Sequence, residues 1–158
     1  MTDIDDETAA APWAAMVADA AEIADEYRAE EWTVERAETV DVAPWSADDG
    51  SGGGLVALLT DDSYDRLADL VDGDRPTFES AEIYRRRVEG TVFLIAVELD
   101  APSMSAVVLP LYYRVEECED ALAAATADGR LQVRVRAEDS DDWLTFVHDE
   151  PALFEPDE

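Results

Sequence analysis

Apolar residues recur at helical spacing in three segments of the chain. The first begins at Pro12, a residue that suits a first helical turn, and its apolar stripe comprises Trp13, Met16, Val17, Ala20, Ile23, Ala24 and Tyr27. A second stripe lies within residues 61–73, where Asp61 and Asp62 can cap a helix that stops at Gly73. The third segment, 115–128, is rich in alanine and ends at Gly129. The pattern therefore predicts three helices.

Strand patterns fill the remaining chain. Residues 131–136 alternate apolar and polar positions, whereas 91–99 (TVFLIAVEL) is almost continuously apolar, as in a central strand covered on both faces. The other predicted strands are 33–42, 55–60, 80–89, 104–113 and 143–148. The order α-β-β-α-β-β-β-α-β-β predicts an α+β fold with a mainly antiparallel sheet.

No internal repeat or linker divides this pattern. We expect a single domain over residues 11–150, between an acidic flexible N-terminus (1–10) and an acidic C-terminal tail (151–158). The loop APWSADDGSGGG, rich in glycine, serine and aspartate, is expected to separate the predicted strands 33–42 and 55–60.

The net charge indicates more about the surface of the protein than about its fold. Of 158 residues, 40 are acidic and 11 are basic, all of them arginine, which gives a net charge of -29. Exposed like charges repel over a Debye length of about 10 Å at 0.1 M salt but only about 3 Å at 1 M. We interpret the acidic coat as an adaptation to a cytoplasm with molar salt, such as that of haloarchaea. Nucleic-acid binding is disfavoured because no arginine-rich surface could neutralise several phosphates.

The start of the chain and its apolar runs indicate location. MTDIDDETAAAPW has no basic region and no apolar stretch of the kind found in secretion signals. No apolar run reaches the length of about 18 residues that a membrane-spanning helix needs. We therefore expect a cytoplasmic protein without a membrane partner. The single cysteine, Cys118, excludes an internal disulfide and a cysteine-based zinc site.

Candidate catalytic and cofactor-binding groups are few. His148, followed by Asp149 and Glu150, could act as a general base, although a strand-edge histidine with a satisfied ring nitrogen is the simpler interpretation. Cys118 is surrounded by carboxylates that oppose thiolate formation, so we expect an inert buried side chain. The glycines of 50–54 precede a strand, and the chain has no lysine, so a flexible loop is favoured over a phosphate loop. Adjacent aspartates lack the spacing of a calcium loop, so we expect no metal site and no cofactor.

Four arginines form the candidate ligand site. Arg85 and Arg87 share one face of a predicted strand, and Arg134 and Arg136 lie on the exposed face of a later strand. If those strands are neighbours, the four side chains form one patch that could bind a phosphate or carboxylate. The alternative is that they pair with nearby acids such as Glu82, Glu89 and Glu138.

The absence of a catalytic set favours a non-enzymatic module that binds a protein partner or its own copy. Three apolar residues are the candidate partner contacts: Trp45 in the glycine-rich loop, and Leu153 and Phe154 in the tail. The alternative function is a small-molecule regulatory domain that binds an anion through the four arginines. A hydrolase that uses His148 is a third hypothesis.

Several segments resemble a known group of sequences. They are WAAMVADAAEIADEYRAEEW, FLIAVEL, AVVLPLYYR, ALAAATADGRLQVRVRAED and LTFVHDEP. Together they are similar to small acidic haloarchaeal proteins that form a family of unknown function. The resemblance covers most of the chain and concerns core strands and turn signals. It implies a shared fold and lineage, and it implies no activity, cofactor or catalytic residue.

Overall fold

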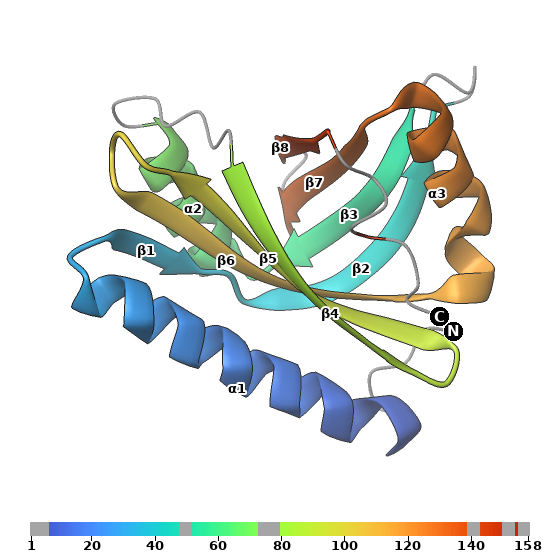
Figure 1. The fold of residues 1–158 in the computed structure, drawn as a ribbon, viewed down its shortest axis with the longest axis horizontal. Coiled ribbons are helices and arrows are strands. Elements are labelled where there is room, and N and C mark those ends of the chain that lie inside the picture. The colour runs from blue at the N-terminus through green and yellow to red at the C-terminus, as the bar shows by residue number, and fades with distance from the viewer. Residues whose placement is uncertain (1–6, 48–51, 73–79, 139–142, 150–153, 155–158) are drawn as a thin grey trace.

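The computed structural model describes residues 7–47, 52–72, 80–138, 143–149 and 154 (Figure 1). Within these ranges the elements follow in the order α1 (Glu7–Ala29), β1 (Thr33–Arg36), β2 (Thr39–Ser46), β3 (Gly53–Leu59), α2 (Asp61–Asp72), β4 (Ser80–Val88), β5 (Thr91–Asp100), β6 (Ser105–Arg114), α3 (Val115–Asp128), β7 (Leu131–Ala137) and β8 (Trp143–His148). The predicted α+β class, the single domain and the order of elements are confirmed. The predicted strand 33–42 is divided into β1 and the start of β2.

The strands form two four-stranded sheets instead of one. The first sheet has the order β1-β6-β5-β4, and the second has the order β2-β3-β7-β8. Four of the six strand pairs are antiparallel, whereas β1–β6 and β3–β7 are parallel. The connection from β1 to β2 carries the chain from one sheet to the other, which the hydrophobic pattern alone does not reveal (Figure 1).

The apolar core comes mainly from β5, β6, β3 and β7. Nearly every residue of β5 and β6 is buried, as their continuous apolar runs predict. In β7 the alternating pattern places Leu131, Val133 and Val135 in the core and turns the intervening residues to the other face. Helix α1 packs on β1, β6 and β5, while α3 packs mainly on β2 and β3, and α2 on β7 and β1.

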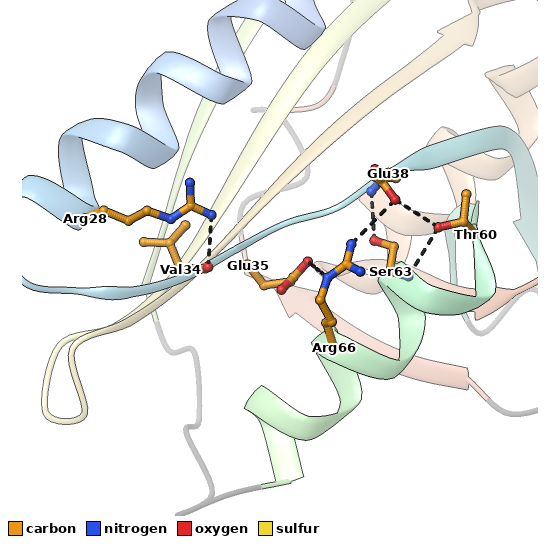
Figure 2. Close-up of polar contacts among 7 residues, drawn as sticks. All are labelled: Arg28, Val34, Glu35, Glu38, Thr60, Ser63 and Arg66. Carbon is orange, nitrogen blue, oxygen red and sulfur yellow. Dashed lines mark hydrogen bonds and ion pairs between the residues drawn. The ribbon is translucent and has the colours of Figure 1, made fainter.

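Helix α2 is attached to the junction between β1 and β2 by polar contacts (Figure 2). Thr60 caps the helix, because its Oγ1 accepts a hydrogen bond from the Ser63 backbone N–H at 3.2 Å, whereas Asp61 and Asp62, the predicted caps, lie in the first turn. The Ser63 Oγ accepts a bond from the Glu38 N–H at 2.9 Å. Arg66 pairs with Glu35 at 3.1 Å and with Glu38 at 3.5 Å. These contacts fix the corner at which the chain changes sheets.

Both ends of the described chain extend the fold beyond the predicted domain. Helix α1 begins at Glu7, five residues before Pro12, in keeping with the high helix propensity of the three alanines at 9–11. At the other end Phe154 is fully buried. The Tyr113 hydroxyl donates a hydrogen bond to the Phe154 carbonyl oxygen, so this part of the predicted tail is packed into the core.

Candidate functional site

The second sheet has an outer face, which points away from the core and is exposed near β7 and β8. We define the open face by five residues that strand registers place on this side: Trp45, Arg134, Arg136, Trp143 and Val147. Residues directly opposite in adjacent strands share a face, and Arg136 lies opposite Trp143. The buried alternate residues of β7 point the other way, into the core. The open face is therefore the side of the second sheet that points away from the core formed by the described strands.

Arg134 lies at the centre of the open face, against two indole rings. Its guanidinium carbon is 3.6 Å from the centroid of the Trp45 ring and 4.7 Å from that of Trp143. The Trp45 Nε1 donates a hydrogen bond to the Gln132 carbonyl oxygen at 3.3 Å. Gly54 lies between Trp45 and Gln132 in the sheet, and its lack of a side chain allows the close approach of the Gln132 backbone. Both rings present electron-rich faces to the cation and hold it in place.

The charge of Arg134 is not paired within the described residues. No carboxylate there forms an ion pair with it, although the chain carries 40 acids. Arg66, in contrast, has two carboxylate partners. The Nε of Arg134 is buried and has no hydrogen-bond partner in the described part of the chain. Among the described residues, the contacts that orient the Arg134 guanidinium are thus aromatic.

Beside Arg134, the open face exposes apolar surface. Trp143 and Val147 are 52% and 50% exposed, the highest fractions among the large hydrophobic residues that the structure describes. Strand β8, with the sequence WLTFVH, contains no acidic residue or arginine. In so acidic a chain, this surface combines an exposed indole, an exposed valine and a guanidinium that no described carboxylate pairs with.

The four predicted site arginines do not lie on one face. Arg85 and Arg87 lie on β4 and face the same side as Leu94 and Val92 of β5, in the first sheet. Arg134 lies in the second sheet, so β4 and β7 are not neighbours and the condition for a single patch is not met. The Arg87 Nε donates to the Glu89 carbonyl oxygen at 2.9 Å. Of the predicted set, the structure brings together Arg134 and Arg136.

The three predicted partner contacts have different positions. Trp45 belongs to β2 and not to a loop, and it is half-buried against Arg134. Phe154 is fully buried, with its ring centroid 4.7 Å from that of His148, so it is not available to a partner. Leu153 lies outside the described residues. Trp143 and Val147 were missed, and the clue to them was their alternation with the buried residues of 143–148.

A buried polar pair joins the two sheets behind the open face. The His148 Nε2 lies 2.8 Å from the Glu98 Oε2, within ion-pair distance, although neither atom meets the geometry of a hydrogen bond. The residues are 6% and 1% exposed, so a substrate cannot reach them. Burial raises the pKa of Glu98 above its ordinary value, and the contact with His148 opposes that rise. The acid that contacts His148 is thus Glu98 of the first sheet, whereas the predicted partner Glu150 lies outside the described residues.

The other candidate groups are the single cysteine and the possible metal ligands. Cys118 is buried, and burial together with the nearby Glu117 raises the pKa of its thiol to about 12, as expected for an inert cysteine. Among the described residues, no three histidine, cysteine, aspartate or glutamate side chains are close enough to hold a metal ion. None of the described helices is both long enough and apolar enough to cross a membrane.

Comparisons with known proteins identify one match. A family model described as "Family of unknown function (DUF7529)" matches residues 2–156. No curated protein and no solved structure matches the chain.

Proposed function

We propose, for a chain that belongs to the family of unknown function DUF7529, that it is a non-enzymatic protein-binding module whose binding surface is the open face. The observation that carries this proposal is the position of Arg134, held between Trp45 and Trp143 without a carboxylate partner among the described residues. Tryptophan and arginine are the residues that most often dominate binding energy at protein interfaces.

The chemistry of the open face supports a particular kind of partner. The free edge of an arginine guanidinium binds a carboxylate through two parallel hydrogen bonds. Trp143 and Val147 would bury apolar side chains on either side of that contact. We therefore propose a partner segment that carries a glutamate, an aspartate or a terminal carboxylate next to apolar residues.

Replacing Arg134 with glutamine tests this proposal, because it removes the charge and the guanidinium and retains a polar side chain. We expect Arg134→Gln to weaken binding of short peptides that combine glutamate with leucine or valine by about tenfold or more, since hydrogen bonds to charged groups contribute about 1.5–3 kcal/mol. Calorimetric titration in molar KCl measures this change. Arg28→Gln is the matched control, because Arg28 is an exposed arginine that pairs with Asp25 on α1. Equal binding by both variants would contradict the proposal.

A second candidate function is regulation by a small anion. It is supported by the position of Arg134 and Arg136 on the same face of β7, two residues apart. If this function holds, inorganic phosphate or citrate raises the melting temperature, and Arg134→Ala combined with Arg136→Ala abolishes the shift. A rise in melting temperature with peptides but not with these anions favours the protein-binding function.

We also propose that the protein works in a cytoplasm with molar salt, as the small haloarchaeal proteins it resembles imply. The net charge of -29 supports this location, because self-repulsion is screened at such salt concentrations. We expect the melting temperature to rise by several degrees between about 0.1 M and 2 M KCl. Scanning calorimetry at a series of KCl concentrations measures it, with sucrose at matched osmolality as the control. A melting temperature that does not change with KCl would argue against a salt-adapted protein.

A further inference from the structure

Among the described residues, strand β8 is an edge strand with little of the usual protection against pairing. Among the described strands it pairs only with β7. Natural edge strands are protected by charged side chains, prolines or bulges. Its six residues, WLTFVH, include no acid, arginine or proline, and the one ionisable side chain, His148, points into the core, whereas the edge strand β4 of the first sheet carries three consecutive arginines and Glu82. An apolar edge of this kind stands out in a chain with a net charge of -29. We therefore infer that a strand of another molecule pairs with β8.

We propose that β8 pairs antiparallel with β8 of a second copy of this chain, so that two second sheets join into one continuous sheet. The charge pattern supports a second copy of β8 as the partner strand. Because β8 contains no carboxylate, two paired copies of it place no carboxylates of the strand opposite each other. Pairing through the same strand on both copies gives a closed twofold dimer.

The exposure pattern of β8 determines the register of this pairing. Residues directly opposite must share a sheet face, so Trp143, Thr145 and Val147 can only face one another across the twofold axis. With Thr145 opposite the partner's Thr145, each Trp143 lies opposite the partner's Val147. Shifting the strands by two residues places Thr145 opposite Trp143 or Val147 and leaves the other large residue without an apolar partner. The register centred on Thr145 therefore buries both half-exposed residues at once.

This inference goes beyond the proposed function but shares Trp143 and Val147 with it, because pairing of β8 would place against the second copy the apolar surface that the proposed partner segment would contact. Arg134 lies on β7, one strand away from the contact, so a carboxylate could bind whether or not the copies pair. The two charged copies repel each other at low salt, so we expect dimers in molar KCl and dissociation at about 0.1 M KCl, where the Debye length is about 10 Å.

Sedimentation equilibrium of the full chain in molar KCl tests the contact. We expect a dimer for the unmodified chain and a monomer for Val147→Glu, which places a carboxylate opposite the partner's Trp143. Val40→Glu is the matched control and should remain dimeric, because Val40 is a 43% exposed valine on β2. A monomeric unmodified chain, or a dimer that Val147→Glu leaves intact, would overturn the proposal.

Cysteine crosslinking tests the register without disturbing the apolar contact. Thr145→Cys should form an intermolecular disulfide under mild oxidation, because directly opposite Cα atoms lie about 4.5–5.5 Å apart. Val147→Cys should not, because two copies of position 147 would lie four residues apart along the strand, about 13 Å. Cys118 is buried and does not compete. Crosslinking at 147 and not at 145 would overturn the register.

Peptide binding by the crosslinked Thr145→Cys dimer, compared with its Arg134→Gln derivative, separately reports whether the proposed function holds.

Discussion

Replacing His148 with leucine is expected to lower the free energy of unfolding by about 3 kcal/mol or more at neutral pH. The substitution removes the partner of Glu98, which is 1% exposed and whose Oε2 contacts the His148 Nε2 at 2.8 Å. A buried carboxylate without a partner must either remain charged in an apolar environment or take up a proton. Urea unfolding of the unmodified chain and His148→Leu in molar KCl measures the loss.

The double variant Glu98→Leu with His148→Leu is the control for this prediction. Apolar residues of similar volume often replace a buried ion pair without a loss of stability. We therefore expect the double variant to be more stable than His148→Leu alone. If the double variant is the less stable of the two, the cost comes from packing against Phe154 and not from an uncompensated carboxylate.

The loss in His148→Leu should depend on pH. Burial raises the pKa of Glu98, and removing His148 removes the contact that opposes this rise. A group whose pKa is higher in the folded state stabilises the fold while it is protonated in both states, and this contribution is lost as the pH rises through the folded-state pKa. The defect should therefore be largest at neutral pH and shrink as the pH falls toward the ordinary glutamate pKa of 4.5. A loss that is constant with pH would show that Glu98 does not titrate in this way.

Replacing Gly54 with alanine is expected to have the second large effect, a loss of more than about 3 kcal/mol or failure to fold. An added Cβ would lie 1.9 Å from the Gln132 carbonyl oxygen and 2.8 Å from its carbonyl carbon. These are backbone atoms of β7, so neither a rotamer change nor a shift of one side chain relieves the clash. The parallel pairing of β3 with β7 would have to open. Circular dichroism and urea unfolding measure the result.

Gly90→Ala is the matched control for Gly54→Ala. Gly90 lies in the turn between β4 and β5, and a Cβ there would meet no atom within 4 Å. We expect this variant to fold with a stability close to that of the unmodified chain. Equal stability of the two alanine variants would mean that β3 and β7 are not as closely packed at Gly54 as the structure indicates.

Hydrophobic periodicity predicts which residues are buried but not which strands are neighbours. It correctly places 91–99 in the core and turns Arg134 outward, because these depend on the local alternation of residues. The separation of Arg85 from Arg134 depends on the division of the strands between two sheets, which is decided by contacts between distant segments. Trp45 was placed in a loop because of the glycines and aspartates that follow it, yet pairing with β3 extends β2 through Ser46.

The pair formed by Glu98 and His148 shows another limit of the sequence. The two residues are fifty positions apart, and only the packing of one sheet against the other brings them into contact. The available signal was Glu98 itself, a single acid in the apolar run 91–99, because a buried carboxylate requires a partner. The burial of Phe154 was equally hidden, since the acidic residues around it are typical of an exposed tail.

The arrangement of aromatic rings provides the open face with a fluorescent signal of its own. Of the four tryptophans, Trp13 and Trp32 contact the rings of Tyr112 and Tyr27 at the α1 side of the molecule. Trp45 and Trp143 contact the cation of Arg134. An event that moves this guanidinium changes the surroundings of two indoles and leaves the other two as an internal reference. Emission from the unlabelled protein can therefore report occupation of the open face in real time.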